Sequence, residues 1–600
     1  MIMKNIFRKK LTYLTIVSVL GTAIACNENE FLDVPVTGQV SGSQLLTEAG
    51  LNGLLIGVYA ALNGDTNLGW FSGQANWLWG SIRGGDANKG SDAGDFNTII
   101  PYARFEQTPT DPLHNNKWRG SYEGISRANI YLSNLAAFEG LAEEDKAPLE
   151  GEGRFLRGLY YFELRRAFLN VPWINETITD AEAVLKPNDA EVWPNIEADF
   201  MFAMENLPET QAEVGRVNKW AAAAFLARTY MYQDKFAEAK ALYDDIIANG
   251  QTSNGLKYGL VENFEDVFRG TNENHKETIF AFQAAANTGD INNTNHEIAM
   301  NYPYNTGPSG PGECCGFFQP SFELVNSYRT NASGLPLLDG SYNNAGNAVA
   351  DDYGLLSSQA FTPDAGPLDP RLDHSIGRRG IMFLDWQKHP GDAWIRDQGF
   401  AGPYTQKKYS YYEADKGTYQ DGSSWTPGYH SINFMIMRYA DVLLMAAEAE
   451  IEVGSLTKAL EYVNMIRRRA GNSVVLDPDA DANPSTPEID PVPAANYVIS
   501  SYPAFGSQDE ARRAVRFERK LELALEGQRF FDLVRWGIAD PVLNAYLDYE
   551  GSRLQTNLGG ATFTPNQDEY LPIPQDQIDL QQAEGSDGAT SVLRQNPGYN

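Results

Sequence analysis

The 600-residue sequence predicts a mainly α-helical protein, in which helical repeats form a scaffold and a large loop-rich region is inserted between them. Two observations predict this fold class. Apolar side chains recur at helical spacing through residues 46–284 and 431–545, which we assign to an N-terminal and a C-terminal helical region. Residues 285–430 lack that period and are rich in Gly, Pro, Asn and Tyr. A connection of this length is either functional or ordered by the scaffold around it.

Helical periodicity in the N-terminal region predicts several individual helices that precede the repeats in the sequence. Leu156, Leu159 and Tyr160, for example, fall three and four residues apart and would share one face. The segments with this pattern are 49–62, 118–135, 147–168 and 192–207.

Two later segments share one order of small and large residues. Trp220–Ile247 contains Ala227, Tyr230, Phe236, Ala239 and Tyr243, and Arg438–Gly471 repeats the pattern with Ala446, Ala449, Ala459 and Leu460. Alanine lets the two helices of a pair approach closely, and the aromatic rings fill the space between pairs. This order is typical of tetratricopeptide-type repeats, and two copies favour it over generic pairing of amphipathic helices. A third helical block covers residues 510–536.

The N-terminus has the pattern of an export signal. Four cations precede the apolar stretch Leu11–Ala25, which is too short to span a bilayer comfortably. The order Ala23-Ile24-Ala25-Cys26 resembles a bacterial lipobox. This resemblance implies that residues 1–25 are a signal peptide, that Cys26 is lipidated, and that residues 26–45 are a lipidated tether. The acidic stretch 27–30, in which Glu28 and Glu30 follow asparagines, resembles the surface-export signal of Bacteroidetes lipoproteins.

Charge and motif content exclude several classes of function. A net charge of −31 argues against binding to nucleic acid or to anionic lipid headgroups. Once residues 1–25 are removed, only the adjacent Cys314 and Cys315 remain after Cys26, which indicates neither a disulfide scaffold nor a zinc site. No serine-hydrolase elbow, zinc-protease motif or nucleotide-binding loop is present. We therefore expect no catalytic residue and no cofactor.

Two acidic segments have spacings that invite a calcium interpretation. Asp86–Asp95 alternates oxygen-bearing side chains, and Asp477–Glu488 resembles an EF-hand loop. In the second segment, Ala482 replaces the glycine of the turn and Pro484 removes a backbone amide that such loops use. We interpret both segments as solvated acidic turns and expect no metal.

Four segments together resemble the SusD/RagB family of outer-membrane glycan-binding lipoproteins. The two most specific are 519–537 and 570–580, the second of which is closed by Asn596–Tyr599. The other two are 31–41 and 85–95, and the latter is followed by Trp118 and by Ser126–Asn129. Their order is that of the family across nearly the whole chain, and residues 546–600 correspond to the family's C-terminal tail.

The resemblance implies a fold and a function together. It implies four tetratricopeptide-like helix pairs with a loop-rich region, here residues 285–430, that carries the ligand site. It also implies a surface-exposed lipoprotein of the cell outer membrane that binds oligosaccharides and delivers them to a SusC-like, TonB-dependent β-barrel, without bond cleavage. Peptide binding within the same family and, less favoured, glycoside hydrolysis remain alternatives. The anchor and the interrupted repeats argue against a tetratricopeptide adaptor that binds only protein.

Sugar binding requires flat aromatic faces with polar groups at their rim. The segment 70–86 provides Trp77 and Trp79 as candidate platforms, with Asn76, Arg83 and Asp86 as polar partners. The alternative for either tryptophan is a position in the core of the protein.

Two further aromatic clusters lie in the loop-rich region. Tyr304 and Phe317 flank Cys314 and Cys315 in a Gly/Pro-rich loop. In an exported protein the two cysteines can form a vicinal disulfide that makes a stiff apolar platform, and two reduced, buried cysteines are the alternative. The third cluster contains Trp386 and Trp394 and ranks below the other two.

Overall fold

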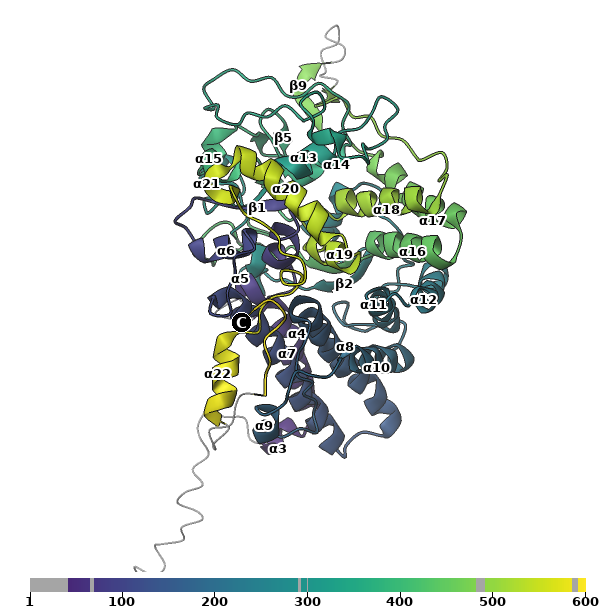
Figure 1. Ribbon diagram of the computed structural model, residues 1–600. Helices are drawn as coiled ribbons and strands as arrows, with labels where there is room; N and C mark the ends of the chain where they lie inside the picture. Colours follow the sequence, from purple (N-terminus) through teal and green to yellow (C-terminus); the bar gives the residue numbers. More distant parts are fainter. Residues whose placement is uncertain are drawn as a thin grey trace, which may run out of the picture.

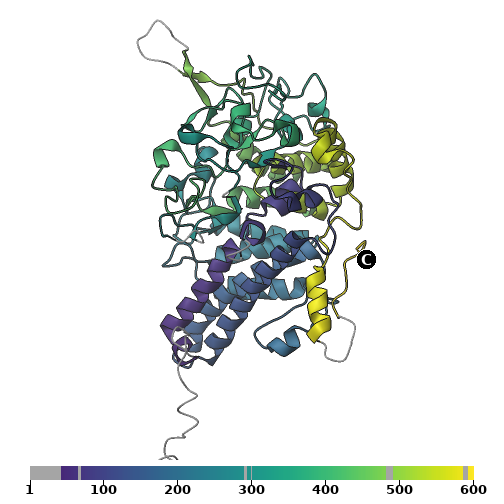
Figure 2. The same ribbon diagram turned by 90° about the vertical axis from the view of Figure 1, so that its left-hand side faces the viewer.

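Long antiparallel helices form one part of the molecule, and loop-rich segments pack against them (Figures 1 and 2). This computed structural model describes residues 42–64, 69–289, 293–298, 300–481, 491–584 and 592–599. The signal peptide, Cys26 and most of the tether lie outside the described residues. No helix in the described ranges combines the length and the apolar character needed to cross a membrane.

The four segments predicted from helical periodicity are helices. They are α4 (Glu48–Ala60), α7 (Pro112–Ala137), α8 (Glu143–Phe168) and α10 (Trp193–Asn206). Local sequence explains where two of them begin. The Thr47 hydroxyl accepts a hydrogen bond from Gly50 N at the start of α4, and Pro112 occupies the first turn of α7, where its missing N–H costs nothing. α7 and α10 both pack on α8.

The repeat segments form the expected helix pairs. They are α11 (Lys219–Met231) with α12 (Phe236–Asn249), and α16 (Tyr439–Val453) with α17 (Leu456–Ala470). The alanines that define the pattern, such as Ala227 and Ala449, are fully buried. α12 packs on α16, so the two pairs are neighbours although the loop-rich region separates them in sequence. α18 (Gln508–Glu522) packs on both α16 and α17. The mainly helical, tetratricopeptide-like fold class is therefore confirmed.

Between the repeats the elements are short. The helices are α13 (Phe322–Ser327), α14 (Arg371–Ser375) and α15 (Gln398–Ala401), and the strands are β3 (Phe317–Pro320), β4 (Ile376–Gly377), β5 (Met382–Phe383), β6 (Gln387–Lys388) and β7 (Thr405–Gln406). β3 pairs antiparallel with β1 (Ala87–Gly90), with Asn88 opposite Gln319. β2 (Thr278–Phe282) pairs with β8 (Phe434–Arg438), which brings the two ends of the loop-rich region together.

The remaining helices and strands lie before the repeats, between them or towards the end of the chain. They are α3 (Gly42–Leu45), α5 (Gly69–Ser72), α6 (Ile100–Ala103), α9 (Asp180–Ala183), β9 (Leu476–Asp481), β10 (Pro491–Pro493), α19 (Arg529–Arg535), α20 (Ala539–Arg553), α21 (Gln555–Leu558) and α22 (Gln575–Glu584). The C-terminal tail is tied to α8, because the Asn596 side-chain amide donates to the carbonyls of Phe168 and Leu571 at 2.6 and 2.7 Å.

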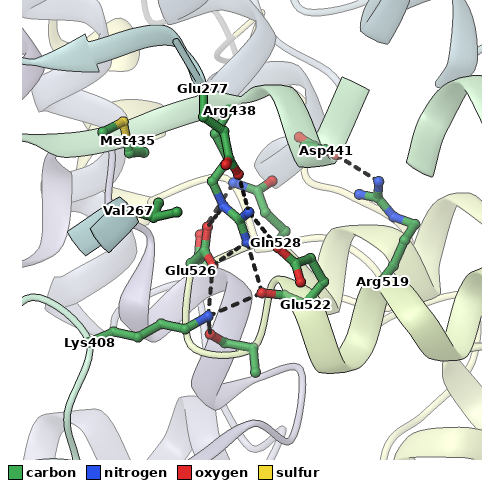
Figure 3. Close-up of polar contacts among 12 residues, drawn as sticks. Val267, Glu277, Lys408, Met435, Arg438, Asp441, Arg519, Glu522, Glu526 and Gln528 are labelled. Atoms are coloured by element: carbon green, nitrogen blue, oxygen red, sulfur yellow. Dashed lines mark hydrogen bonds and ion pairs between the residues drawn. The ribbon is translucent and has the colours of Figure 1, made fainter. Parts of the chain in front are cut away.

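A cluster of buried charges joins the loop-rich region to the C-terminal helices (Figure 3). Arg438 lies at its centre. The Arg438 guanidinium donates to Glu277 and Glu526 at 2.8 Å and to Glu522 at 2.7 Å. Lys408, from the loop-rich region, donates to Glu526 at 2.8 Å. The side chains of these five residues are all at most 4% exposed.

The cluster continues to Arg371 of α14, which pairs with Asp369 and Glu518 at 2.7 Å and with Glu522 at 2.9 Å. A neighbouring pair joins Arg519 of α18 to Asp441 of α16 at 2.6 Å. We call the cluster and this neighbouring pair together the buried charge network. Breaking such a network by removing one partner is costly, because the opposite charge stays buried without compensation.

We expect the substitution Arg438→Met to lower the free energy of unfolding of soluble residues 27–600 by roughly 3–5 kcal/mol, because three carboxylates lose their common partner. Urea unfolding at pH 7 measures the change. The control is Arg127→Met, which removes an exposed ion pair with Glu123 and should cost at most about 1 kcal/mol. Equal unfolding midpoints for Arg438→Met and the unmodified protein would contradict this role for the network.

The network also predicts sensitivity to acid. Burial alone would raise the pKa of Asp441, but the charges of Arg228 and Arg519 outweigh it and lower the pKa to about 2, below the ordinary 3.8. A folded-state pKa below the unfolded value adds stability above pH 4 that is lost as the pH falls from about 4 towards 2. We therefore expect the melting temperature of Asp441→Asn to be lower at pH 7 and to change less over that interval. The assignment would be contradicted if the melting temperatures of Asp441→Asn and of the unmodified protein changed by the same amount across this pH range.

Candidate functional site

Trp77 and Trp79 are packing residues. They begin a six-residue π-helical segment, Trp77–Ile82, and are only 2% and 1% exposed. Their indole N–H groups donate to the carbonyls of Trp70 and Phe71 at 2.6 and 2.7 Å. The structure thus corrects the prediction that these rings form a sugar platform, since neither ring has a free face.

Their predicted polar partners are buried as well. The Asn76 side-chain amide donates to Glu163 at 3.0 Å, and Arg83 donates to the Asp568 carbonyl at 2.6 Å. Asp86 accepts hydrogen bonds from Leu525 N at 3.1 Å and from the Ser81 hydroxyl at 3.3 Å, and burial raises the pKa of Asp86 to about 6. These contacts connect the segment to the C-terminal part of the chain and leave no polar rim for a ligand.

The second predicted cluster is partly exposed. Tyr304 and Cys314 are half-buried, whereas Phe317 and Cys315 are 1% and 6% exposed. Cys314 and Cys315 are joined by a disulfide, which is one of the two alternatives that the sequence leaves open. Backbone hydrogen bonds from Asn305 N to the Glu313 carbonyl and from Gly316 N to the Tyr302 carbonyl hold the disulfide beside Tyr304.

The third cluster is buried too, with Trp394 and Trp386 at 3% and 9% exposure. The Trp386 indole donates to the Tyr411 carbonyl at 3.0 Å, which accounts for its inward position. The predicted clusters nevertheless lie together in space. The Trp77 ring is 5.9 Å from Phe318, and Tyr304 N donates to the Trp394 carbonyl at 3.0 Å. The buried members of these clusters form the packed layer beneath a surface that carries Tyr304 and other aromatic residues.

Four aromatic side chains are accessible at this surface, and we call them the aromatic surface. Trp425 is 61% exposed, Phe96 is 37% exposed, and Trp70 and Tyr304 are half-buried. The Trp70 and Phe96 rings are 5.6 Å apart, and Phe96 stands edge-on to Phe317 of the layer below at 5.8 Å.

Tyr429 connects Trp425 to this group. The Trp425 ring lies 6.1 Å from the Tyr429 ring, and its indole N–H is 3.4 Å from the Tyr429 hydroxyl. Burial raises the pKa of Tyr429, and the indole N–H groups of Trp425 and Trp70, which face its hydroxyl, oppose that rise. Trp70 and Trp425 therefore flank one buried tyrosine.

Polar groups border the aromatic surface at Tyr304. The Arg396 guanidinium lies 5.4 Å from the centre of the Tyr304 ring and pairs with Asp92 at 2.9 Å and with Asp95 at 2.6 Å. All three charged side chains are about one-third exposed, at 32%, 33% and 27%. Planar rings beside an exposed guanidinium and carboxylates can bind both the C–H face and the hydroxyl groups of a sugar.

Several residues around the aromatic surface have strained backbone conformations. Phe96, Ser91 and Asn305 have φ angles of 44°, 56° and 51°, in the left-handed region that costs energy for residues with a side chain. Such conformations persist only where the surrounding structure enforces them, and they concentrate at ligand sites. Sequence reasoning misses Phe96. Its one available signal is its position directly after the acidic turn 86–95.

The first acidic segment is not the solvated turn predicted from the sequence, because Asp86 is buried and residues 87–90 form the buried strand β1. Residues 482–488 of the second segment lie outside the described residues. Both segments have cationic partners. Asp92 accepts hydrogen bonds from the backbone N–H groups of Gly94 and Asp95 in addition to its pair with Arg396. Asp477 and Asp479 pair with Lys388 at 2.7 and 2.9 Å. Within the ranges that the structure describes, no group of three or more His, Cys, Asp and Glu side chains is arranged to hold a metal ion.

We expect the Cys314–Cys315 disulfide to be present in the folded protein. Alkylation of unreduced protein followed by peptide mass spectrometry should leave both sulfurs unlabelled, and prior reduction should make both reactive. Labelling of both cysteines before reduction would contradict the assignment.

Comparisons with known proteins agree with the observed helical fold. The model of the SusD family matches residues 276–599, and a second family model, described as starch-binding and associating with the outer membrane, matches residues 31–231. SusD-like protein P2 of Formosa agariphila is 25% identical over 601 residues, which cover 98% of this chain and 99% of that protein.

Two solved structures share the fold. A SusD superfamily protein from Bacteroides vulgatus superposes with a TM-score of 0.65 at 22% identity, covering 92% of this chain and 99% of the other. Surface glycan-binding protein A from Bacteroides thetaiotaomicron, solved in complex with laminarihexaose, gives a TM-score of 0.61 at 19% identity, with 92% and 99% coverage.

Proposed function

Because this chain belongs to the SusD family, we propose that it binds oligosaccharides at the cell surface through the aromatic surface and does not cleave them. The observation that carries the proposal is the group of accessible aromatic rings at Trp70, Phe96, Tyr304 and Trp425, bordered by Arg396 and its two carboxylates. Rigid rings of this kind contact a sugar face with little loss of entropy. The relative that shares this fold and was solved with laminarihexaose supports an oligosaccharide as the ligand class.

The two carboxylates that border the aromatic surface fit binding better than acid catalysis. A glycosidase requires one carboxyl group with a raised pKa to protonate the leaving oxygen. The Asp92 carboxylate has the opposite character, because hydrogen bonds from the backbone N–H groups of Asp95 and Gly94, together with Arg396, lower its pKa. Asp95 is bound to the same guanidinium.

Delivery to a transporter is the second part of the proposal. Lipidation at Cys26 would anchor the protein to the outer membrane, and a SusC-like, TonB-dependent β-barrel would receive the bound oligosaccharide. This part rests on the lipobox-like sequence, on the family resemblance and on the family model described as associating with the outer membrane.

We expect Trp425→Ala and Phe96→Ala each to weaken binding of a glycan that soluble residues 27–600 recognise by about tenfold or more, because each removes an exposed ring from the binding surface. Calorimetric titration, after a screen of a glycan panel, measures this change. Leu580→Ala, which truncates a side chain that is 56% exposed on α22, is the matched control and should bind normally.

The variant Trp77→Ala tests whether this buried ring has a packing role, as opposed to a role in ligand binding. We expect it to lower the melting temperature, since truncation of a buried aromatic residue costs roughly 3–5 kcal/mol. If both Trp425→Ala and Phe96→Ala bound the glycan with full affinity, the aromatic surface would not be the binding site. Detection of cleaved glycan would overturn the non-catalytic role. Binding to peptides but to no glycan would make peptides, and not oligosaccharides, the ligand class.

A further inference from the structure

A cavity lies among the C-terminal helices, apart from the aromatic surface. It has a volume of about 320 Å³ and is formed by α16, α18, α19 and the turn before α12. In Figure 1 these helices are on the other side of the molecule from α5, α6 and β1, which carry or adjoin the aromatic surface. The charged and aromatic residues that line it and enter the argument are Glu448, Glu452, Arg512, Arg516, Arg535 and Trp536.

Two of the three arginines are neutralised by paired carboxylates. Arg512 donates to both oxygens of Glu452 at 2.7 Å, and Arg535 donates to both oxygens of Glu448 at 2.7 Å. Glu448 also accepts a hydrogen bond from the Trp536 indole at 2.9 Å. These bidentate pairs use the carboxylates fully and leave them little capacity for another cation.

Arg516 is the exception. Its guanidinium lies 5.0 Å from the centre of the Trp536 ring, but no carboxylate in the described part of the chain forms an ion pair with it. Burial lowers the pKa of Arg516, the charges of Glu448 and Glu452 oppose that shift, and those of Arg535 and Arg512 reinforce it, yet an arginine stays charged under any ordinary condition. A half-buried guanidinium thus lines the cavity without a direct ion pair, in a chain whose net charge is −31.

Asp234 is the remaining acidic residue in the lining, and it forms no ion pair with Arg516 in the described part of the chain. Its side chain is exposed, so water screens its charge. The Arg516 guanidinium lies over the Trp536 ring, a contact that favours a cation beside the indole.

We propose that this cavity is a second binding site, which takes an oxyanion (a carboxylate or a sulfate) carried by a small ligand such as an acidic sugar. A guanidinium binds two oxygens of such a group through parallel hydrogen bonds, and this geometry distinguishes an oxyanion from a neutral hydroxyl group. A volume of about 320 Å³ is at the lower end of the range for small-molecule sites. The proposal does not depend on glycan binding at the aromatic surface, so either binding site can be disproved without affecting the other.

Tryptophan fluorescence tests the proposal, because Trp536 lines the cavity. Soluble residues 27–600 are titrated at constant ionic strength with glucuronate, glucose 6-sulfate and neutral glucose. We expect a saturable change with one or both anions and none with glucose, and the anion that gives it identifies the carboxylate or the sulfate as the preferred group. The change should be absent in Trp536→Phe while calorimetry still detects binding.

Arg516→Gln should weaken that binding by about ten- to a hundredfold, because it removes a charged hydrogen-bond donor. Arg513→Gln, an exposed position on the same helix, is the matched control and should bind normally. Melting curves of both variants establish that they are folded. The proposal is overturned if neither anion gives saturable binding, if Arg516→Gln binds as tightly as Arg513→Gln, or if neutral glucose binds equally well.

Discussion

The loop-rich region depends on the buried charge network around Arg438. The helices of this region that the structure describes have at most six residues and the strands at most four. Apolar side chains such as Phe322, Leu372 and Phe383 join the common core, but not along long helix faces like those of α7, α8 and α10. Lys408 and Arg371 in addition connect this region to Glu526, Glu518 and Glu522 at 2.7–2.9 Å. Buried ion pairs require accurate geometry, because each charge has lost its hydration and only close contact with the opposite charge offsets that free-energy cost.

The same contacts position the aromatic surface. Glu526, which holds Arg438 and Lys408, begins a turn whose next residue, Gly527, donates from its backbone N–H to Ser81 at 3.0 Å. Leu525, just before it, donates to Asp86 at the start of β1. β1 leads into the acidic turn that ends at Phe96, and its pairing with β3 places Phe317 beneath that ring. The C-terminal helices, far along the chain, thereby fix a surface built mainly from the first hundred residues and from the loop-rich region.

The scaffold could be predicted from sequence because helical period and the small–large order of the repeats are local signals. Ala227 and Ala449 pack as that order requires. The aromatic surface could not be predicted in the same way, since composition shows where rings are dense but does not indicate which side of a backbone faces water. Trp77 and Trp79 stood out because several tryptophans are close in sequence, yet a π-helical segment turns both inward. Phe96 and Trp425 stand apart from such clusters in the sequence. Phe96 packs on Trp70 and on Phe317 from other segments, whereas Trp425 contacts the nearby Tyr429.

The central claim is that oligosaccharides bind over Phe96, Tyr304 and Trp425, above the buried tryptophans. Hydrogen–deuterium exchange of soluble residues 27–600, with and without a glycan selected from the panel, tests this claim most directly. The account predicts slower exchange on binding in residues 91–96, 302–316 and 418–429, with little change in 77–86, where exchange is already limited by burial. Protection confined to other parts of the chain, with these three segments unchanged, would contradict it.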